Sequence, residues 1–328
     1  MSKILVAGGA GYIGSHMVAQ LLRSGYEPLV ADSLVTGHKE SVKGAPLLIG
    51  DLRDRKFLRD IFSSYEIDAV IDFAAFSLVG ESTVNPLKYY GNNVVGAIEM
   101  LDAMREFDVK KIVFSSTAAT YGEQEEMPIL ETATTLPTNP YGETKLAIER
   151  MLKWCDAAYG IKYAALRYFN AAGADNEADI GEDHDPESHL IPNVLKTALG
   201  QRKTVSIFGN DYPTPDGTCV RDYIHVTDLA DAHLLACEYL GKSGKSGVFN
   251  LGNGDGYSVK EIIEIAREVT GLDIVAKITA RRDGDPAMLV ASNALAKNTF
   301  GWTPVRGLHE IISSAWQWHS THPGGYSK

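Results

Sequence analysis

The chain has 328 residues, 45% of them hydrophobic and 22% charged, and its formal net charge at pH 7 is −11. These values indicate a folded globular protein of about two domains and exclude a mainly disordered chain. An acidic chain is a poor general binder of nucleic acids and anionic membranes, so we expect neither as a partner. Any phosphate group that binds must be held by local features.

The first segment in chain order, residues 4–22, contains no Asp, Glu, Lys or Arg and has the length of a membrane span. Four glycines, Gly8, Gly9, Gly11 and Gly14, lie near its centre, where a continuous apolar helix would not place them. We therefore expect a buried strand, a glycine turn and an amphipathic helix, in a protein with no membrane anchor.

Strand and helix patterns then alternate. Short apolar runs predict strands at residues 3–7, 28–32, 46–49, 69–73, 111–115 and 163–167. Helical patterns lie between them at residues 58–62, 92–104 and 141–159, and Gly160 is a suitable C-terminal cap for the last. Nearly continuous apolar strands that alternate with helices predict an α/β fold with a doubly wound parallel sheet, which is Rossmann-like.

The pattern changes after residue 170. An acidic, loop-like stretch comes first, and helical segments separated by short strands follow at residues 191–199, 228–240 and 259–270. We expect residues 1–170 to form the Rossmann-like domain and residues 171–328 a smaller mixed α/β domain, with some of the chain returning to the first.

The glycines form the pattern Gly8-x-x-Gly11-x-x-Gly14, directly after a predicted strand and at the start of a helix. Glycine lets the backbone turn tightly and approach a pyrophosphate, and the helix N-terminus offers free N–H groups to that anion. In this context the pattern predicts a dinucleotide site, with Tyr12 and Ile13 also in contact with the cofactor.

Asp32 ends the second predicted strand. A carboxylate there accepts hydrogen bonds from an adenosine ribose and repels a 2′-phosphate, and no arginine follows it directly, so the sequence favours NAD over NADP. Asp51 and Leu52, after the third predicted strand, are placed to contact the adenine. A simple helix cap is an equal alternative for Asp51.

Tyr141 and Lys145 form a Tyr-x-x-x-Lys motif on a predicted helix, where residues four apart share a face. An ammonium beside a phenol stabilises the phenolate and lowers a pKa that is normally about 10, so the tyrosine can act as a base near neutral pH. The motif alone is common by chance. After a dinucleotide fingerprint it indicates an active site.

Hydroxyl side chains lie at the end of the fifth predicted strand, where doubly wound sheets bind their ligands. Ser115 and Ser116 are expected to form hydrogen bonds with backbone groups at the end of the strand. Thr117 is placed to bridge a substrate hydroxyl and Tyr141. The three cysteines form no C-x-x-C motif and cannot all pair, which argues against a disulfide framework and a zinc ribbon and favours the cytoplasm. We expect no metal site.

With these motifs the sequence resembles the extended short-chain dehydrogenase/reductase family, and within it the UDP-sugar 4-epimerases. The resemblance runs through essentially the whole chain, with the most similar segments at residues 8–16, 79–82, 89–93, 139–145, 166–170, 216–225 and 281–285. The later segments discriminate best, because many nucleotide-sugar enzymes share the earlier ones. The resemblance implies an NAD cofactor, a UDP-hexose substrate and a homodimer.

The resemblance also implies roles for individual residues. Further cofactor contacts are expected from Phe73, Ala74, Ala75, Asn92, Ser115, Lys145 and Tyr168. The UDP-sugar is expected to contact Thr117, Asn170, His189, Leu190, Phe208, Arg221, Tyr223, Arg282 and Asp285. An acidic protein that binds UDP needs local arginines, and arginine suits bidentate phosphate contacts.

Some positions depart from the family pattern. Ser77 lies near a position where some relatives carry lysine, Cys219 stands in place of a usual glycine, and His189 stands where some have asparagine. In relatives restricted to glucose and galactose a tyrosine walls the sugar pocket. Leu289 takes that place in a gap-free alignment, which leaves room for an N-acetyl group, although Met288 or a plain core role remains an alternative.

The reaction implied is inversion at carbon 4 of a UDP-hexose through a 4-keto sugar. A nucleotide-sugar dehydratase would need an Asp-Glu pair after Thr117, whereas Ala118 and Ala119 follow here. A non-catalytic NAD sensor would usually lack the Tyr-Lys pair. An epimerase of another UDP-sugar, such as UDP-N-acetylglucosamine, a uronate or a pentose, stays open. The helices at 92–104 and 141–159 carry apolar stripes, which fit either a dimer interface or burial within the domain.

Overall fold

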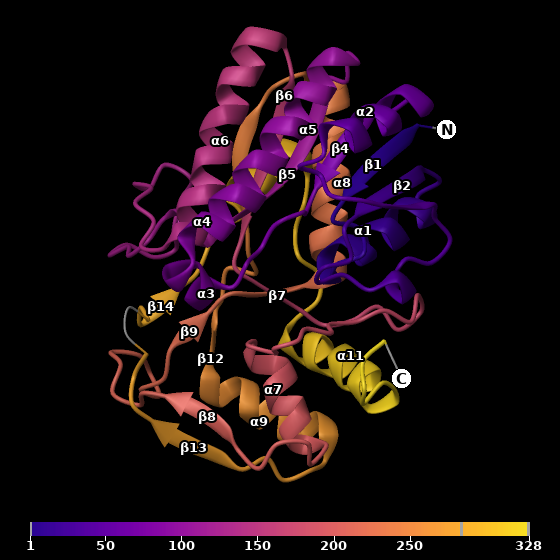
Figure 1. The fold of residues 1–328 in the computed structure, drawn as a ribbon. Helices are drawn as coiled ribbons and strands as arrows, with labels where there is room; N and C mark the ends of the chain where they lie inside the picture. The colour runs from indigo at the N-terminus through magenta and orange to yellow at the C-terminus, as the bar shows by residue number, and fades with distance from the viewer. Residues whose placement is uncertain (1, 283–284, 327–328) are drawn as a thin grey trace.

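A computed structural model describes residues 2–282 and 285–326 (Figure 1). Its main sheet has seven strands in the order β11-β6-β5-β4-β1-β2-β3, and every neighbouring pair is parallel. The strands are β1 (Lys3–Ala7), β2 (Glu27–Asp32), β3 (Leu47–Ile49), β4 (Ala69–Asp72), β5 (Lys111–Thr117), β6 (Lys162–Tyr168) and β11 (Gly247–Leu251). The predicted doubly wound α/β fold is confirmed.

Helices cover both faces of this sheet. Alternate residues of β1 enter two different cores: Ile4 and Val6 pack on one side, Leu5 and Ala7 on the other. The first core is closed by α1 (Tyr12–Arg23) and α8 (Val226–Ser243), and the second by α2 (Arg55–Ser64), α5 (Val95–Glu106) and α6 (Pro140–Tyr159). Burial on both faces is the reason that the central residues of the strands are apolar on both sides of the sheet.

One predicted helix and one predicted helix cap differ from the structure. The helix expected at residues 92–104 begins as α5 at Val95, after a π-helical turn, η2, at Tyr90–Val94. Helix α2 is capped by Asp54, whose carboxylate accepts from the backbone N–H of Lys56 at 2.8 Å. The alternative of a helix cap for Asp51 is therefore wrong, because the helix begins later than that residue.

The chain beyond residue 170 contributes to two regions. Strand β11 pairs with β6 and α8 packs on the main sheet, although both come late in the chain. The rest forms a third core, shown in the lower part of Figure 1. Its elements are β7 (Asn170–Ala172), α7 (Leu190–Ala198), β8 (Val205–Phe208), β10 (Tyr223–His225), β12 (Tyr257–Ser258), α9 (Val259–Thr270), β13 (Ala276–Thr279) and α11 (Leu308–Thr321). Strands β9 (Val220–Arg221) and β14 (Met288–Leu289) join β12 in a three-stranded sheet.

Short elements complete the chain: η1 (Lys39–Ser41), α3 (Val79–Val84), α4 (Pro86–Tyr89), η3 (Ala118–Thr120) and α10 (Ala294–Phe300). Among the described residues, no helix combines the length and the apolar character that crossing a membrane requires.

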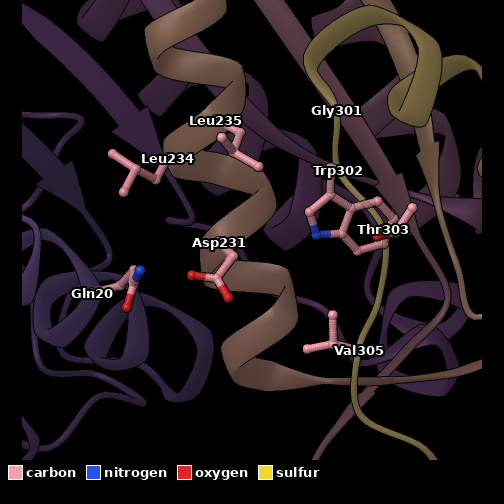
Figure 2. A pocket seen from close by; sticks show the side chains of 8 residues that line it. All are labelled: Gln20, Asp231, Leu234, Leu235, Gly301, Trp302, Thr303 and Val305. Atoms are coloured by element: carbon pink, nitrogen blue, oxygen red, sulfur yellow. The ribbon is translucent and has the colours of Figure 1, made fainter.

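A cavity of about 290 Å³ opens between α1, α8 and residues 301–305 (Figure 2). Its lining residues are Gln20, Asp231, Leu234, Leu235, Gly301, Trp302, Thr303 and Val305. Neither the glycine turn nor the Tyr-x-x-x-Lys motif contributes a side chain to this lining. Doubly wound sheets bind their ligands at the carboxyl ends of the strands, which is where these motifs lie.

Candidate active site

The glycine turn lies between β1 and α1, where the sequence predicts it. Gly8 has a positive φ of 73°, and a Cβ on it would lie 2.7 Å from the backbone nitrogen of Ala74. A Cβ on Gly14 would lie 2.2 Å from the carbonyl oxygen of Gly8. Helix α1 begins at Tyr12 after Gly11, which has no side chain to cap the first N–H groups. The turn thus leaves a cradle that fits a pyrophosphate.

Asp32 is held in a fixed orientation beside this turn. Its Oδ2 accepts from the backbone N–H of Ala10 at 2.9 Å, and its Oδ1 accepts from the backbone N–H of Leu34 at 2.8 Å. Each carboxylate oxygen has further lone pairs, so the side chain retains capacity to accept from ribose hydroxyls.

Asp51 and Leu52 follow β3, the last strand on this side of the sheet. The carboxylate of Asp51 pairs with Arg53, with Nε 2.9 Å from Oδ1 and Nη2 2.5 Å from Oδ2. This guanidinium holds the pKa of Asp51 below its usual range. The strand order places both residues beyond Asp32, in the direction an adenosine would extend from the glycine turn.

The other side of the turn faces the segment after β4, which contains Phe73, Ala74 and Ala75. Asn93, in the π-helical turn beside Asn92, fixes this segment. Its Oδ1 accepts from the backbone N–H of Phe76 at 2.9 Å, and its Nδ2 donates to Thr144 in α6 at 3.1 Å. Sequence reasoning missed Asn93, although it belongs to the segment at residues 89–93 that resembles the family.

The structure brings the three predicted catalytic residues together. Tyr141 and Lys145 lie in the first turns of α6, which Asn139 caps by accepting from the Gly142 N–H at 2.9 Å. Thr117 ends β5, and its side chain lies close enough to Tyr141 to lower the pKa of that phenol. The ammonium of Lys145 is buried and donates to the carbonyl oxygen of Ser115 at 2.7 Å.

The charges at this site differ from the sequence expectation in one respect. Burial raises the pKa of Tyr141, and the Thr117 side chain opposes that shift. Burial also lowers the pKa of Lys145 to about 8, against the attraction of Asp72 and Glu149. In the protein alone the phenol is therefore not the acidified group that we expected, because desolvation outweighs the favourable contacts. A further positive charge, such as a bound nicotinamide, is required to favour the phenolate.

Two buried carboxylates that sequence reasoning missed surround Lys145. Asp72 ends β4, and burial raises its pKa to about 6 against the attraction of Lys145. Glu149 lies one turn beyond Lys145 and forms an ion pair with Arg167, with Nε 2.9 Å from Oε1 and Nη2 2.5 Å from Oε2. The spacing 141, 145 and 149 along one helix face was a signal that could have found Glu149.

The remaining cofactor residues lie at the same edge. Tyr168 ends β6 as the register partner of Thr117, and its hydroxyl is hydrogen-bonded to the Ser115 side chain. Ser115 thus uses its carbonyl for Lys145 and its hydroxyl for Tyr168, which differs from the simple backbone role that we expected.

The predicted substrate residues gather around the short strands of the third core. Asn170 in β7 is the register partner of Tyr223 in β10. The side chain of Arg221 pairs with Asp285 at 2.6 Å. His189 is the residue before α7, and Leu190 is its first residue.

Arg282 is also placed among these residues, with its guanidinium 3.9 Å from the centre of the Phe208 ring. Residues 283–284 of the same motif lie outside the described residues. Both arginines therefore contact other predicted site residues rather than unrelated surface acids.

The fold and the glycine turn define the class of Rossmann-like, dinucleotide-dependent enzymes. The sequence model of the NAD dependent epimerase/dehydratase family matches residues 4–252, and the chain belongs to that family. It is 59% identical over 325 residues to the UDP-glucose 4-epimerase of Halalkalibacterium halodurans, which covers 99% of this chain and 97% of that one.

Solved structures agree with this assignment. A crystal structure of a UDP-glucose 4-epimerase has a TM-score of 0.98 and 54% identity, and the match covers 100% of both chains. The UDP-glucose 4-epimerase of Brucella ovis in complex with NAD has a TM-score of 0.94 and 46% identity, covering 97% of this chain and 98% of that one.

The glycine turn yields a first testable prediction. In Gly14→Ala, the new Cβ meets backbone atoms of Gly8 and Gly9, which no rotamer change relieves. We expect NAD content to fall at least tenfold (roughly 1.4 kcal/mol), and the free energy of unfolding to fall by about 1–3 kcal/mol. The nucleotide released on denaturation and urea titration measure the two effects.

Gly241→Ala, in the exposed part of α8, is the matched control, since the nearest atom to its added Cβ is 4.0 Å away. It should keep NAD and be equally or more stable. Full NAD content in Gly14→Ala would refute the assignment of the cradle.

Proposed function

We propose that this protein is an NAD-dependent UDP-glucose 4-epimerase that interconverts UDP-glucose and UDP-galactose. The observation that carries the proposal is the placement of Thr117 and Tyr141 together beside buried Lys145, at the sheet edge that also carries the glycine turn. The identity to curated UDP-glucose 4-epimerases over nearly the full length supports the same reaction.

The residues present fit NAD, since Gly8 and Gly14 allow a turn too tight for any Cβ, and Gly11 leaves the first N–H groups of α1 without a side-chain cap. Asp32 would accept hydrogen bonds from the adenosine ribose, and Lys145 would donate to the second ribose. When bound, NAD accepts a hydride from carbon 4 of the sugar and later returns it. The cofactor is not consumed, so it has no need to dissociate between turnovers.

The chain itself moves the proton. Tyr141, as phenolate, removes the proton from the 4-hydroxyl, and Thr117 holds that hydroxyl and the phenol in one line. The 4-keto sugar then rotates about its diphosphate linkage and presents its other face, and Tyr141 gives the proton back. Rotation requires a tightly held UDP and a loosely held sugar.

The UDP site is formed by the region after residue 170, and we assign residues 1–170 to NAD and residues 171–328 to the UDP-sugar. Asn170, Arg221 and Arg282 bind the diphosphate, with His189 and Leu190 along it. Phe208, Tyr223 and Asp285 hold the uridine. A UDP-glucose 4-epimerase of Bifidobacterium longum has been solved with NAD⁺ and UDP, at a TM-score of 0.93.

We infer a homodimer from an apolar face on α5 and α6. Val95 and Ile98 in α5 are 39% and 44% exposed, and Trp154 in α6 is 72% exposed. Other apolar residues of both helices are buried against the sheet. Each helix therefore has one apolar side in the core of the domain and further apolar side chains in solvent. Pairing of two copies would cover this face. A cytoplasmic location fits the three free, buried cysteines.

Substitution of the base tests the reaction. Tyr141→Phe keeps the ring but removes the hydroxyl, so we expect kcat to fall by about 10²–10⁴-fold while NAD content is unchanged. Conversion of UDP-glucose to UDP-galactose is the assay. Tyr159→Phe, at the exposed end of the same helix, is the control and should retain activity. Turnover near that of the unmodified protein in Tyr141→Phe would exclude the mechanism.

The role of Lys145 predicts a change in pH dependence. A nearby cation lowers the pKa of a phenol, so Lys145→Ala should raise the pKa of Tyr141 and move the rise in turnover to higher pH. We also expect kcat at neutral pH to fall by about 10²-fold or more. Profiles of kcat against pH measure both effects.

Lys153→Ala, on an exposed position of α6, is the matched control and should leave the profile unchanged. A Lys145→Ala profile with the same midpoint would show that Lys145 does not act on the base.

The sugar range depends on Leu289. Strand β14 pairs with β9 in parallel, and Leu289 is the register partner of Arg221, so the two side chains lie on one face of the small sheet. Met288 is the partner of buried Val220 and faces away. We therefore place Leu289 at the wall of the sugar pocket and propose that UDP-N-acetylglucosamine is accepted in addition to UDP-glucose.

Leu289→Tyr should lower the activity on UDP-N-acetylglucosamine at least tenfold more than that on UDP-glucose, since added bulk excludes the larger sugar (about 1.4 kcal/mol). Relative kcat/KM values for the two substrates measure this. An equal loss on both, or no N-acetyl activity in the unmodified protein, would reject the placement.

A further inference from the structure

The loop before α7 gathers four side chains that the proposed reaction does not use as a group. Glu182, His184, Glu187 and His189 each offer one ligand atom, and these atoms all lie within 4.8 Å of one another. From the cysteine pattern we expect no metal site. The arrangement here consists of imidazoles and carboxylates.

The distances between these atoms resemble those of a coordination shell. Nδ1 of His189 lies 2.8 Å from Oε1 of Glu182 and 3.0 Å from Oε1 of Glu187. Nδ1 of His184 lies 3.1 Å from the same Glu182 oxygen and 3.8 Å from Oε2 of Glu187. Ligand atoms about 2.0–2.1 Å from a tetrahedral Zn²⁺ ion are separated by about 3.3 Å.

Hydrogen bonds within the cluster leave one buried carboxylate oxygen without a partner. The Glu187 side chain is only 4% exposed, and its Oε2 has no hydrogen-bond partner. That oxygen points toward His184 Nδ1, which at 3.8 Å is too far for a hydrogen bond. A buried carboxylate oxygen with no partner is costly, and a cation at the centre of the four groups would satisfy it.

We propose that Glu182, His184, Glu187 and His189 together bind one divalent transition-metal ion, with Zn²⁺ as the expected occupant. Two imidazole nitrogens and two carboxylate oxygens suit Zn²⁺, and four protein ligands are typical of a structural site. The two carboxylates balance the charge of the ion. The side chains of His184 and His189 are 31% and 44% exposed, which gives the ion a route from solvent.

The position of the cluster indicates what the ion stabilises. His189 is the residue from which α7 begins, and the ring of His184 meets Tyr12 of the glycine turn edge-on, with centroids 6.1 Å apart. The ion would fix this loop between the glycine turn and the start of α7. Ligation through Nδ1 leaves Nε2 of His189 free to donate to the diphosphate, a consequence that rests on the proposed function. The metal site itself does not.

The test uses the full-length protein without an affinity tag, stripped with a chelator and dialysed. Zn²⁺ alone is then added, and bound metal is measured by inductively coupled plasma mass spectrometry. We expect one Zn²⁺ per chain and a higher melting temperature on loading. Co²⁺ in its place should give the intense visible absorption of a four-coordinate ion.

Single variants locate the site. His184→Ala and Glu187→Gln should each weaken Zn²⁺ binding by at least about 100-fold, since loss of an outer partner alone costs about 10- to 100-fold. His309→Gln, on the exposed side of α11, is the matched control and should bind like the unmodified protein. Circular dichroism and retained NAD establish that each variant is folded.

Absence of stoichiometric Zn²⁺ in the unmodified protein would overturn the proposal, as would ligand variants that bind like His309→Gln. None of these measurements uses a UDP-sugar or turnover. A failure of the metal site is therefore distinguishable from a failure of the proposed function.

Discussion

The buried ammonium of Lys145 ties helix α6 to the end of strand β5, and the arrangement of the active site depends on that contact. A charged amine is expensive to remove from water, so it is buried only where groups of opposite polarity surround it. The Ser115 carbonyl accepts its hydrogen bond, and Asp72 and Glu149 attract its charge. Because Lys145 and Tyr141 are one turn apart on a rigid helix, fixing the first also places the second against Thr117.

Several other contacts support the same helix. Asn139 caps its start, Asn93 joins its second turn to the segment after β4, and Glu149 bonds to Ser116 at 2.5 Å while pairing with Arg167. These bonds connect α6 to three neighbouring strands at their carboxyl ends. The predicted catalytic residues are thus placed by regular elements, whereas the proposed UDP site consists of short strands of the later region, where small movements cost less.

Much of this architecture was predictable because it follows from local patterns. The central residues of the strands at 3–7, 28–32 and 69–73 are apolar because both faces of the sheet are covered, and the spacing of the glycines predicts the glycine turn. The start of α5 was not predictable, because the π-helical turn before it accompanies the hydrogen bonds of Asn93 to Phe76 and Thr144, which are distant in sequence. The three predicted catalytic residues lie at one edge of the sheet, as expected, whereas burial raises the pKa of Tyr141 instead of lowering it.

Asp72 and the cluster at Glu182 show two further limits of sequence reasoning. Asp72 looked like an ordinary strand end, and only its burial beside Lys145 gives it a role. The spacing of Glu182, His184, Glu187 and His189 is visible in the sequence. Their convergence depends on how the loop folds, which periodicity does not predict.

The central claim is that carbon 4 loses and regains the same hydrogen within one bound substrate. UDP-glucose carrying deuterium at carbon 4 can be incubated with the protein in ordinary water, with no added nucleotide, and the UDP-galactose formed analysed by mass spectrometry and NMR. The account predicts that the product keeps the deuterium at carbon 4. Loss of the deuterium to water, or no product without added nucleotide, would contradict it.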